Sequence, residues 1–345
     1  MKANSHLMHK IVLLTGVFLL GMLNVCAQGQ ANNWYFGYGA GLNFSTGSPR
    51  ALTDGSLYTL EGCATISDDD GNLLFYTDGI TVYGANHSIL TNGTGLFGNP
   101  SSTQSAIIIP QPDTPGIYYI FTVDTTTRQG ETNEGVNYSI VDFTSDPAGV
   151  VREKNTPLLN YAAEKLSAVI KSCTDNSVWL VTLSSASGNQ NFINTVYAFQ
   201  LSSSGLDTTP VRSSAGFVVE DPRGNLKFSP DGTKLAIANA SGGLFLADFD
   251  SESGTVTNTQ RLNINSANYA AYGVEFSPNN RFLYSASSNN EDSRLGAGNH
   301  FSSLIQYDLE AADINASQVS LDESGYYRGS LQLGPDGKIY RALSL

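Results

Sequence analysis

A short hairpin motif recurs along the chain and constrains its fold more than any other feature. The stretch "GNLKFSPDGTKLAIAN" (224–239) contains an apolar alternation, a turn and a second apolar alternation. Similar stretches follow at 274–287 ("VEFSPNNRFLYSAS") and at 331–344 ("LQLGPDGKIYRALS"). A supersecondary unit that returns at such intervals indicates a repeat architecture.

The pattern can be aligned six times along the chain. Each copy begins with a strand whose first and third residues are apolar, as expected of a strand with one buried face. Pro and Asp-Gly in several of the turns suit the fixed φ and the positive φ that tight turns require. The first strands begin at Ala64, Ile107, Ala168, Leu226, Val274 and Leu331.

A second strand pair recurs between the hairpins, and four strands per repeat are typical of a β-propeller blade. We therefore expect an all-β fold, with a single β-propeller domain over 28–345. Six four-stranded blades are favoured, or seven if the chain is a fragment truncated at its C-terminus. The segment 32–52 is similar to an outer strand pair, and the last hairpin lacks such a pair. Pairing of these two segments would close the ring and remove the open sheet edges.

The N-terminus has the layout of a secretory signal peptide over 1–27. Lys2 and Lys10 precede an apolar run from Ile11 to Leu23, and small residues precede a cleavage point after Ala27. The run is shorter than the roughly 20 apolar residues of a membrane-spanning helix. A lipid anchor on Cys26 is the alternative. We expect export to the cell surface or the medium, with no transmembrane segment after cleavage.

Charge and cysteine content narrow the class of protein further. The net charge of −13 would repel phosphate backbones, so nucleic acid is not an expected partner. Cys63 and Cys173 would remain after cleavage, and they allow either one disulfide or two separate thiols, with the unpaired state favoured.

The sequence contains no complete short motif for catalysis or cofactor binding. The run Gly93–Gly98 matches G-x-G-x-x-G, but no helical pattern follows it, as a dinucleotide site requires. The acidic run 67–72 ("SDDDGN") is better explained as a hairpin turn than as a calcium loop. After cleavage the chain has two histidines, His87 and His300, and neither has a second histidine at ligand spacing. We expect no metal and no cofactor, and the sequence favours a non-catalytic protein over an enzyme.

Polar residues gather at one position of the repeat, three residues before each inner strand. In a propeller these positions form a ring at one mouth of the central channel, where convergent polar groups can bind a ligand. Ion pairs among solvated loop residues would explain the same pattern. The candidate ligand-binding residues, with two neighbours of the ring positions included, are Glu61, Gln104, Glu164, Lys165, Arg223, Tyr272 and Arg328.

Most of the chain beyond residue 31 resembles a known group of bacterial propellers. The "SPDG…LA" hairpins are similar to WD40-like repeats of periplasmic propellers. The stretches 60–83 ("LEGCATISDDDGNLLFYTDGITVY"), 100–112 ("PSSTQSAIIIPQP") and 163–172 ("AEKLSAVIKS") resemble the N-terminal propeller of large Bacteroidetes surface proteins. That group is associated with gliding motility, PKD-type domains and type IX secretion. The resemblance implies a surface-displayed binding module and supplies no catalytic residue.

Three functions remain open from the sequence. The first is an exported, monomeric, non-catalytic propeller that serves adhesion or recognition of a glycan or a surface protein. The second is a polysaccharide hydrolase or lyase with Glu61, Glu164 or Asp221 as acid or base, which requires a suitably spaced carboxylate pair. The third is a structural spacer, in which the protein's own side chains plug the channel mouth.

Overall fold

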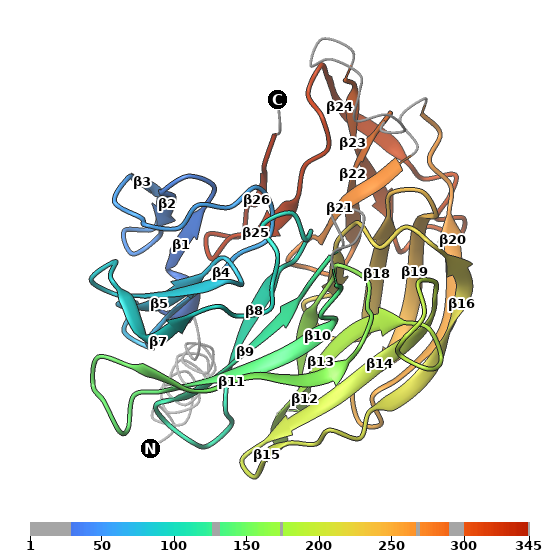
Figure 1. The fold of residues 1–345 in the computed structure, drawn as a ribbon. Coiled ribbons are helices and arrows are strands. Elements are labelled where there is room, and N and C mark those ends of the chain that lie inside the picture. The colour runs from blue at the N-terminus through green and yellow to red at the C-terminus, as the bar shows by residue number, and fades with distance from the viewer. Residues whose placement is uncertain (1–28, 126–131, 173–174, 267–269, 290–299, 344–345) are drawn as a thin grey trace, which may run out of the picture.

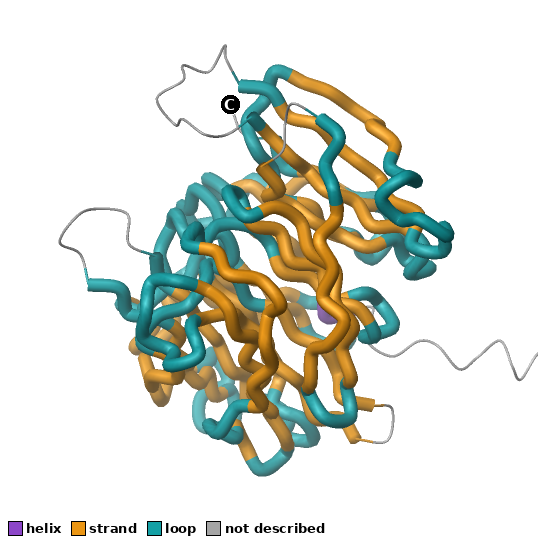
Figure 2. The backbone as a smooth tube through the Cα atoms, turned by 90° about the vertical axis from the view of Figure 1, so that its right-hand side faces the viewer, coloured by secondary structure: helices purple, strands orange, loops and turns teal. Residues whose placement is uncertain are grey.

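The computed structural model describes residues 29–125, 132–172, 175–266, 270–289 and 300–343. Within these ranges the fold is all-β, and the only helical element is the short 3-10 turn η1 (Gly29–Ala31). Figure 2 shows strands running through the whole body. The predicted signal peptide (1–27) and Cys173 lie outside the described residues. No helix in the described ranges is long and apolar enough to cross a membrane.

Five consecutive stretches of the chain each form an antiparallel four-stranded unit. Unit 1 contains β4 (Ala64–Ser67), β5 (Leu73–Thr77), β6 (Thr81–Gly84) and β7 (Ile89–Thr94). Unit 2 contains β8 (Ala106–Pro110), β9 (Ile117–Val123), β10 (Val136–Asp142) and β11 (Val150–Leu159). Unit 3 contains β12 (Ser167–Ser172), β13 (Asp175–Ser184), β14 (Ile193–Ser202) and β16 (Val211–Val219), with the short β15 (Gly205–Leu206) also paired to β14.

The chain continues with unit 4 and unit 5. Unit 4 contains β17 (Leu226–Phe228), β18 (Lys234–Asn239), β19 (Gly243–Asp250) and β20 (Thr255–Leu262). Unit 5 contains β21 (Ala270–Phe276), β22 (Phe282–Ser288), β23 (Ser302–Asp308) and β24 (Val319–Ser324). Figure 1 shows the units following one another around the molecule in a propeller-like arrangement.

All the predicted hairpins form, and the turn at 229–233 shows how the local sequence specifies one of them. Gly232 adopts φ +73°, and its amide donates to the Ser229 carbonyl at 2.8 Å. The Asp231 carboxylate accepts hydrogen bonds from Ser229 Oγ at 2.6 Å and from the Thr233 amide at 3.0 Å. This turn chemistry sets the β17–β18 register, which pairs Phe228 with Leu235.

The hydrophobic core lies between successive units rather than at one centre. Trp179 of unit 3 and Phe245 of unit 4, for example, belong to one buried cluster. Comparable clusters join units 1 and 2, units 2 and 3, and units 4 and 5. Each sheet therefore buries its faces against its neighbours, as stacked blades do.

Units 1 and 2 also touch through their outer strands, which the repeat pattern did not predict. A parallel bridge pairs Thr91 of β7 with Val150 of β11 and joins the two units into one eight-stranded sheet. Asn92, at φ +60°, donates from its amide side chain to the Val151 carbonyl at 2.7 Å. The Lys154 ammonium donates to the Thr94 carbonyl at 2.8 Å. Side chains of the two edges therefore hold the outer strands together.

The two ends of the chain meet at a region that we call the terminal seam. It consists of β1 (Asn33–Phe36), β2 (Ala40–Asn43) and β3 (Arg50–Leu52) from the N-terminal side, with β25 (Leu331–Leu333) and β26 (Ile339–Arg341) from the C-terminal side. The Tyr340 ring centroid lies 5.5 Å from that of Trp34 and 5.6 Å from that of Phe44.

The predicted meeting of the ends is present in the terminal seam, but the predicted strand pairing is not. Among the described residues no backbone ladder joins the N-terminal strands to β25 or β26. Because aromatic rings fill the contact between Trp34, Phe44 and Tyr340, side chains connect the two segments in place of backbone hydrogen bonds.

Candidate functional site

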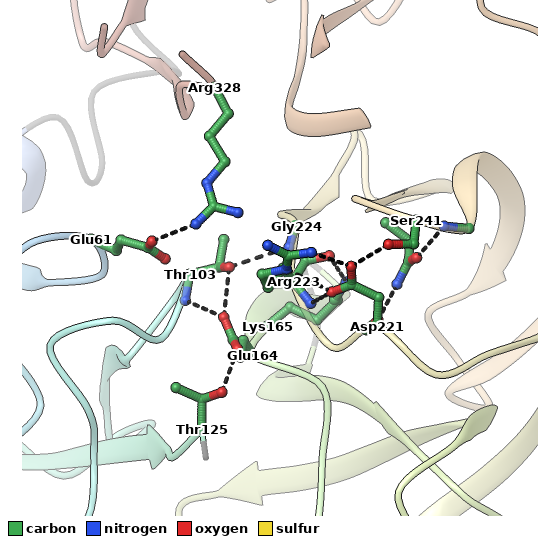
Figure 3. A network of polar contacts seen from close by, with 12 residues as sticks. Glu61, Thr103, Thr125, Glu164, Lys165, Asp221, Arg223, Gly224, Ser241 and Arg328 are labelled. Carbon is green, nitrogen blue, oxygen red and sulfur yellow. Dashed lines mark hydrogen bonds and ion pairs between the residues drawn. The ribbon is translucent and has the colours of Figure 1, made fainter. Parts of the chain in front are cut away.

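The residues that precede the inner strands lie together and are linked by polar contacts (Figure 3). We call the seven predicted ligand-binding residues the inner polar network. They are Glu61, Gln104, Glu164, Lys165, Arg223, Tyr272 and Arg328. Backbone hydrogen bonds connect the segments that lead into the inner strands of successive units. They join the amides of Gly62, Gln104, Glu164 and Asn225 to the carbonyls of Ser102, Glu164, Pro222 and Tyr272, at 3.0, 3.0, 3.1 and 2.8 Å.

Glu164 is a buried carboxylate whose oxygens are occupied by hydrogen-bond donors. One oxygen accepts from the Thr103 amide at 3.1 Å and from Thr103 Oγ1 at 3.0 Å. The other accepts a short bond from Thr125 Oγ1. Since Glu164 is only 3% exposed, these donors replace the water that an ionised carboxylate would otherwise need.

Lys165 is buried beside Glu164 and supports the neighbouring unit. Its ammonium donates to the carbonyls of Ala238 at 2.8 Å and Arg223 at 3.2 Å. Burial lowers the pKa of Lys165 to about 8, although the charges of Asp221 and Glu164 oppose the shift. Lys165 therefore links the segment that precedes β12 to unit 4.

Arg223 forms a two-pronged ion pair with Asp221. Its Nε and Nη2 donate to the two carboxylate oxygens at 2.9 and 2.6 Å. Burial would raise the pKa of Asp221, but the hydrogen bonds from Arg223 and Ser241 outweigh it and lower the pKa to about 2. The Arg223 side chain is 34% exposed, the largest exposed fraction of the ion-paired side chains in the network.

Glu61, Tyr272 and Arg328 connect the first inner hairpin to the last two. Arg328 Nη2 donates to Glu61 at 2.9 Å, and the Tyr272 hydroxyl donates to the other oxygen at 2.8 Å. The Arg328 guanidinium lies 4.5 Å from the Tyr272 ring centroid, a cation–π distance. Burial raises the pKa of Glu61, while Arg328 and Tyr272 act in the opposite direction. Burial also raises the pKa of Tyr272.

Gln104 spans the network, because its amide is bonded to segments of two other units. Gln104 Oε1 accepts from the Leu226 amide at 2.7 Å, and Nε2 donates to the Leu166 carbonyl at 3.0 Å. Thr103 Oγ1 accepts from the Gly224 amide at 3.2 Å. These bonds join the start of unit 2 directly to the start of unit 4, although unit 3 lies between them in the sequence. The protein's own side chains therefore occupy the space where the starts of the units meet.

The structure thus gathers every predicted site residue. Each of them makes polar contacts within the protein, but Arg328 Nη1 is buried without a hydrogen-bond partner in the described part of the chain. The sequence did not single out the partners Thr103 and Thr125. The run "SSTQ" (101–104), which precedes an apolar strand and contains Thr103, was the available signal in the sequence. A buried Glu164 needs hydrogen-bond donors, and the hydroxyl groups of such a run can supply them. No group of three or more His, Cys, Asp or Glu side chains among the described residues could hold a metal ion.

The remaining motifs behave as structural elements. The Asp68 carboxylate accepts from the Asn72 amide at 2.8 Å, which makes the acidic run a hairpin turn. His87 Nδ1 lies 3.0 Å from the Tyr76 hydroxyl. Cys63 is a free thiol whose sulfur contacts the Tyr35 carbonyl at 3.3 Å.

Comparison with known proteins identifies the fold alone. No family model and no curated protein matches the sequence. The structure is similar to that of a "putative 6-phosphogluconolactonase" from Bacteroides uniformis ATCC 8492, with 11% identity, a TM-score of 0.50 and coverage of 88% of this chain and 84% of that chain. This likeness supports the propeller-like all-β fold.

Two further solved structures are less similar. A "putative 6-phosphogluconolactonase" from Bacteroides fragilis NCTC 9343 has 13% identity, a TM-score of 0.42 and coverage of 84% of this chain and 79% of that chain. A luciferin-regenerating enzyme has 12% identity, a TM-score of 0.40 and coverage of 79% of each chain.

Proposed function

We propose that this protein is an exported, non-catalytic β-propeller that recognises a glycan or a protein at the cell surface or in the medium. The observation that carries the proposal is the state of the three candidate catalytic carboxylates. Glu61, Glu164 and Asp221 all have partners within the protein. A general acid or base must reach the proton that it transfers, and a carboxylate that is held in this way is poorly placed for that role.

The proposed blade count is six. Units 1 to 5 are complete, and the terminal seam would supply the sixth blade from both ends of the chain. The Glu61–Arg328 ion pair and the contact of Trp34 with Tyr340 support this count, because both join the beginning of the chain to its end.

The protein's own side chains occupy the centre of the inner polar network, as the spacer function also predicts, so we place ligand contact at its exposed rim rather than in a deep cleft. Arg223 is the ion-paired network residue with the most exposed side chain, and its guanidinium can approach a ligand without displacing a buried group. Arg328 is only 13% exposed and is paired with Glu61. Arg223→Gln is therefore the cleaner test of ligand contact at this rim.

Binding and turnover can be tested together with the chain from residue 28. We expect it to bind at least one member of a glycan array or one surface protein in a pull-down, with no release of reducing ends. Arg223→Gln should weaken that binding while the melting temperature stays within a few degrees. Binding to no glycan and no protein would favour the spacer function.

A polysaccharide hydrolase or lyase is the second candidate, and Glu61 is the residue that favours it. Burial raises its pKa, which is the direction that a general acid needs, and the nearby Glu164 adds to the shift. Polysaccharide cleavage that is lost in Glu61→Gln but kept in Arg223→Gln would replace the recognition proposal with this one.

Export is a separate part of the proposal and rests on residues 1–27. Cleavage after Ala27 would leave Gln28 as the first residue of the secreted chain. N-terminal sequencing of the protein from the culture medium or the cell surface checks this. A lipid-modified Cys26 at the N-terminus would establish the anchor alternative instead.

A further inference from the structure

Two tyrosines stack on one another at the protein surface. The ring centroids of Tyr38 and Tyr58 are 4.0 Å apart with an interplanar angle of 20°. They are 59% and 68% exposed, and Leu60 beside them is 67% exposed. Single exposed apolar residues are ordinary, but a cluster of them marks an interaction site.

The segment that carries Tyr58 has the reverse of the usual strand pattern. Leu57 and Thr59 are each 1% exposed, whereas Tyr58 and Leu60 face outward. Alternation normally places polar residues on the solvated face. Here the outward face is aromatic and aliphatic, whereas the core packing of the segment comes from its inward residues Leu57 and Thr59.

The backbone holds Tyr38 in place against Tyr58. The two residues form an isolated antiparallel bridge, with the Thr59 amide bonded to the Gly37 carbonyl at 3.0 Å and the Gly39 amide to the Leu57 carbonyl at 3.1 Å. Gly37 and Gly39 have φ values of +59° and +68°. Any side chain at either glycine would be strained, so the Gly-Tyr-Gly sequence is suited to presenting this ring.

We propose that Tyr38 and Tyr58 form a platform that stacks against the ring of a neutral sugar, an inference that rests on the recognition function proposed above. The polarised C–H groups of a pyranose ring match the negative face of a phenol ring, and the phenol hydroxyls can bond to sugar hydroxyls. Leu60 extends the apolar surface next to Tyr58.

Size and charge favour a neutral sugar over the other ligands. A stable protein interface takes roughly 20–30 residues on each side, far more than this small cluster. Segments 36–39 and 54–60 contain no lysine or arginine and one acid, Asp54, in a chain of net charge −13. An acidic glycan would therefore be repelled, whereas a neutral one would not.

The platform lies close to the inner polar network. Tyr58 is three residues before Glu61, a separation of at most about 10 Å along an extended chain. A sugar chain stacked on the platform can thus continue toward the rim that carries the polar groups.

Affinity electrophoresis of the chain from residue 28 tests the platform with laminarin, xylan and galactomannan as neutral probes and with alginate and polygalacturonate as acidic ones. We expect at least one neutral polysaccharide to retard the protein. Tyr38→Ala and Tyr58→Ala should each weaken that binding about tenfold, while Tyr58→Trp should retain it. Phe301→Ala is the matched control, since Phe301 is 52% exposed and belongs to another part of the chain.

The outcomes separate this inference from the proposed function. If a neutral polysaccharide binds equally well to the Tyr38→Ala/Tyr58→Ala double variant, or if only the acidic ones bind, the platform is wrong and recognition stands. If the array and pull-down also detect no ligand, both proposals fail. Unchanged melting temperatures of the variants establish that any loss of binding is not a loss of folding.

Discussion

Unit 4 and the terminal seam contain closely similar hairpins that are held in different ways. In unit 4 the hairpin β17–β18 continues by hydrogen bonding into β19 and β20, and Leu226 and Leu235 are fully buried. In the seam β25–β26 is a separate two-stranded sheet, and all three residues of β26 are partly exposed. The turn sequence therefore specifies the hairpin, whereas neighbouring strands determine how firmly it is held.

The largest difference in stability should be between alanine substitutions of Leu235 and of Ile339. These residues occupy the same register position in the two hairpins. We expect Leu235→Ala to lower the free energy of unfolding by about 3–4 kcal/mol, since it opens a cavity in a closed core. Ile339→Ala should cost about 1 kcal/mol, because its site is already partly solvated. Urea unfolding measures both, and equal losses would contradict the distinction between the regions.

The pH dependence of stability should report on Lys165, whose buried ammonium donates to carbonyls at unit 4. Its pKa of about 8 in the folded protein lies below the roughly 10.4 of an unfolded lysine. Between these values the unfolded chain binds the proton that the folded chain has lost, so stability rises with pH. We expect Lys165 alone to contribute a rise of about 1.5 kcal/mol from pH 8 to 9.5.

Lys165→Met is the control for this pH dependence. Urea unfolding at each pH should show the difference in unfolding free energy between the natural chain and the variant widening by about 1.5 kcal/mol from pH 8 to 9.5. Tyrosines with raised pKa values, such as Tyr272, lower the stability of both proteins as the pH approaches 10, so only the difference between the two proteins isolates the contribution of Lys165. The same slope in both proteins would remove Lys165 as its cause.

The ion pair that joins the two ends of the chain should have a smaller effect. Glu61→Gln and Arg328→Met should each destabilise the protein by about 2 kcal/mol, less than for a fully buried pair because both side chains retain some exposure. A double-mutant cycle should give a coupling of about 1 kcal/mol. Strict additivity would mean that the pair does not help to close the ring.

A loss of global stability as small as that of Ile339→Ala should come from Tyr340→Ala, which removes the ring that contacts both Trp34 and Phe44. We expect a loss of about 1 kcal/mol, in line with the aromatic contacts that are removed. Hydrogen exchange should accelerate in β1–β3 and β25–β26 while unit 4 keeps its protection. Uniform acceleration would show that the seam opens only with the whole domain.

The sequence was sufficient for the hairpins because their information is local. Pro, Asp and Gly define the turn at 229–232, and alternation places Leu226 and Phe228 on the strand. It was also sufficient to predict which positions gather around the centre, since each lies at the same offset from a repeated strand. Glu61 and Arg328 meet for this reason, although 267 residues separate them.

The roles of the gathered residues could not be predicted, because they depend on contacts between distant segments. Glu164 accepts hydrogen bonds from Thr103 and Thr125, which precede it by 61 and 39 residues. Gln104 accepts one from the Leu226 amide, which belongs to another unit. The bridge between β7 and β11 likewise depends on Asn92, whose left-handed backbone has no repeat signature. The outward tyrosines were missed because the alternation pattern does not state which face is solvated.

A seam of side chains also affects how the molecule can be assembled. Each of units 1 to 5 pairs its own strands in chain order, and only the terminal seam needs β1–β3 and β25–β26 at the same time. A polypeptide that becomes available from its N-terminus, as during synthesis, can therefore build its sheets one after another. Docking of Tyr340 and Arg328 then becomes the last event, and it requires no strand to be threaded into an existing sheet.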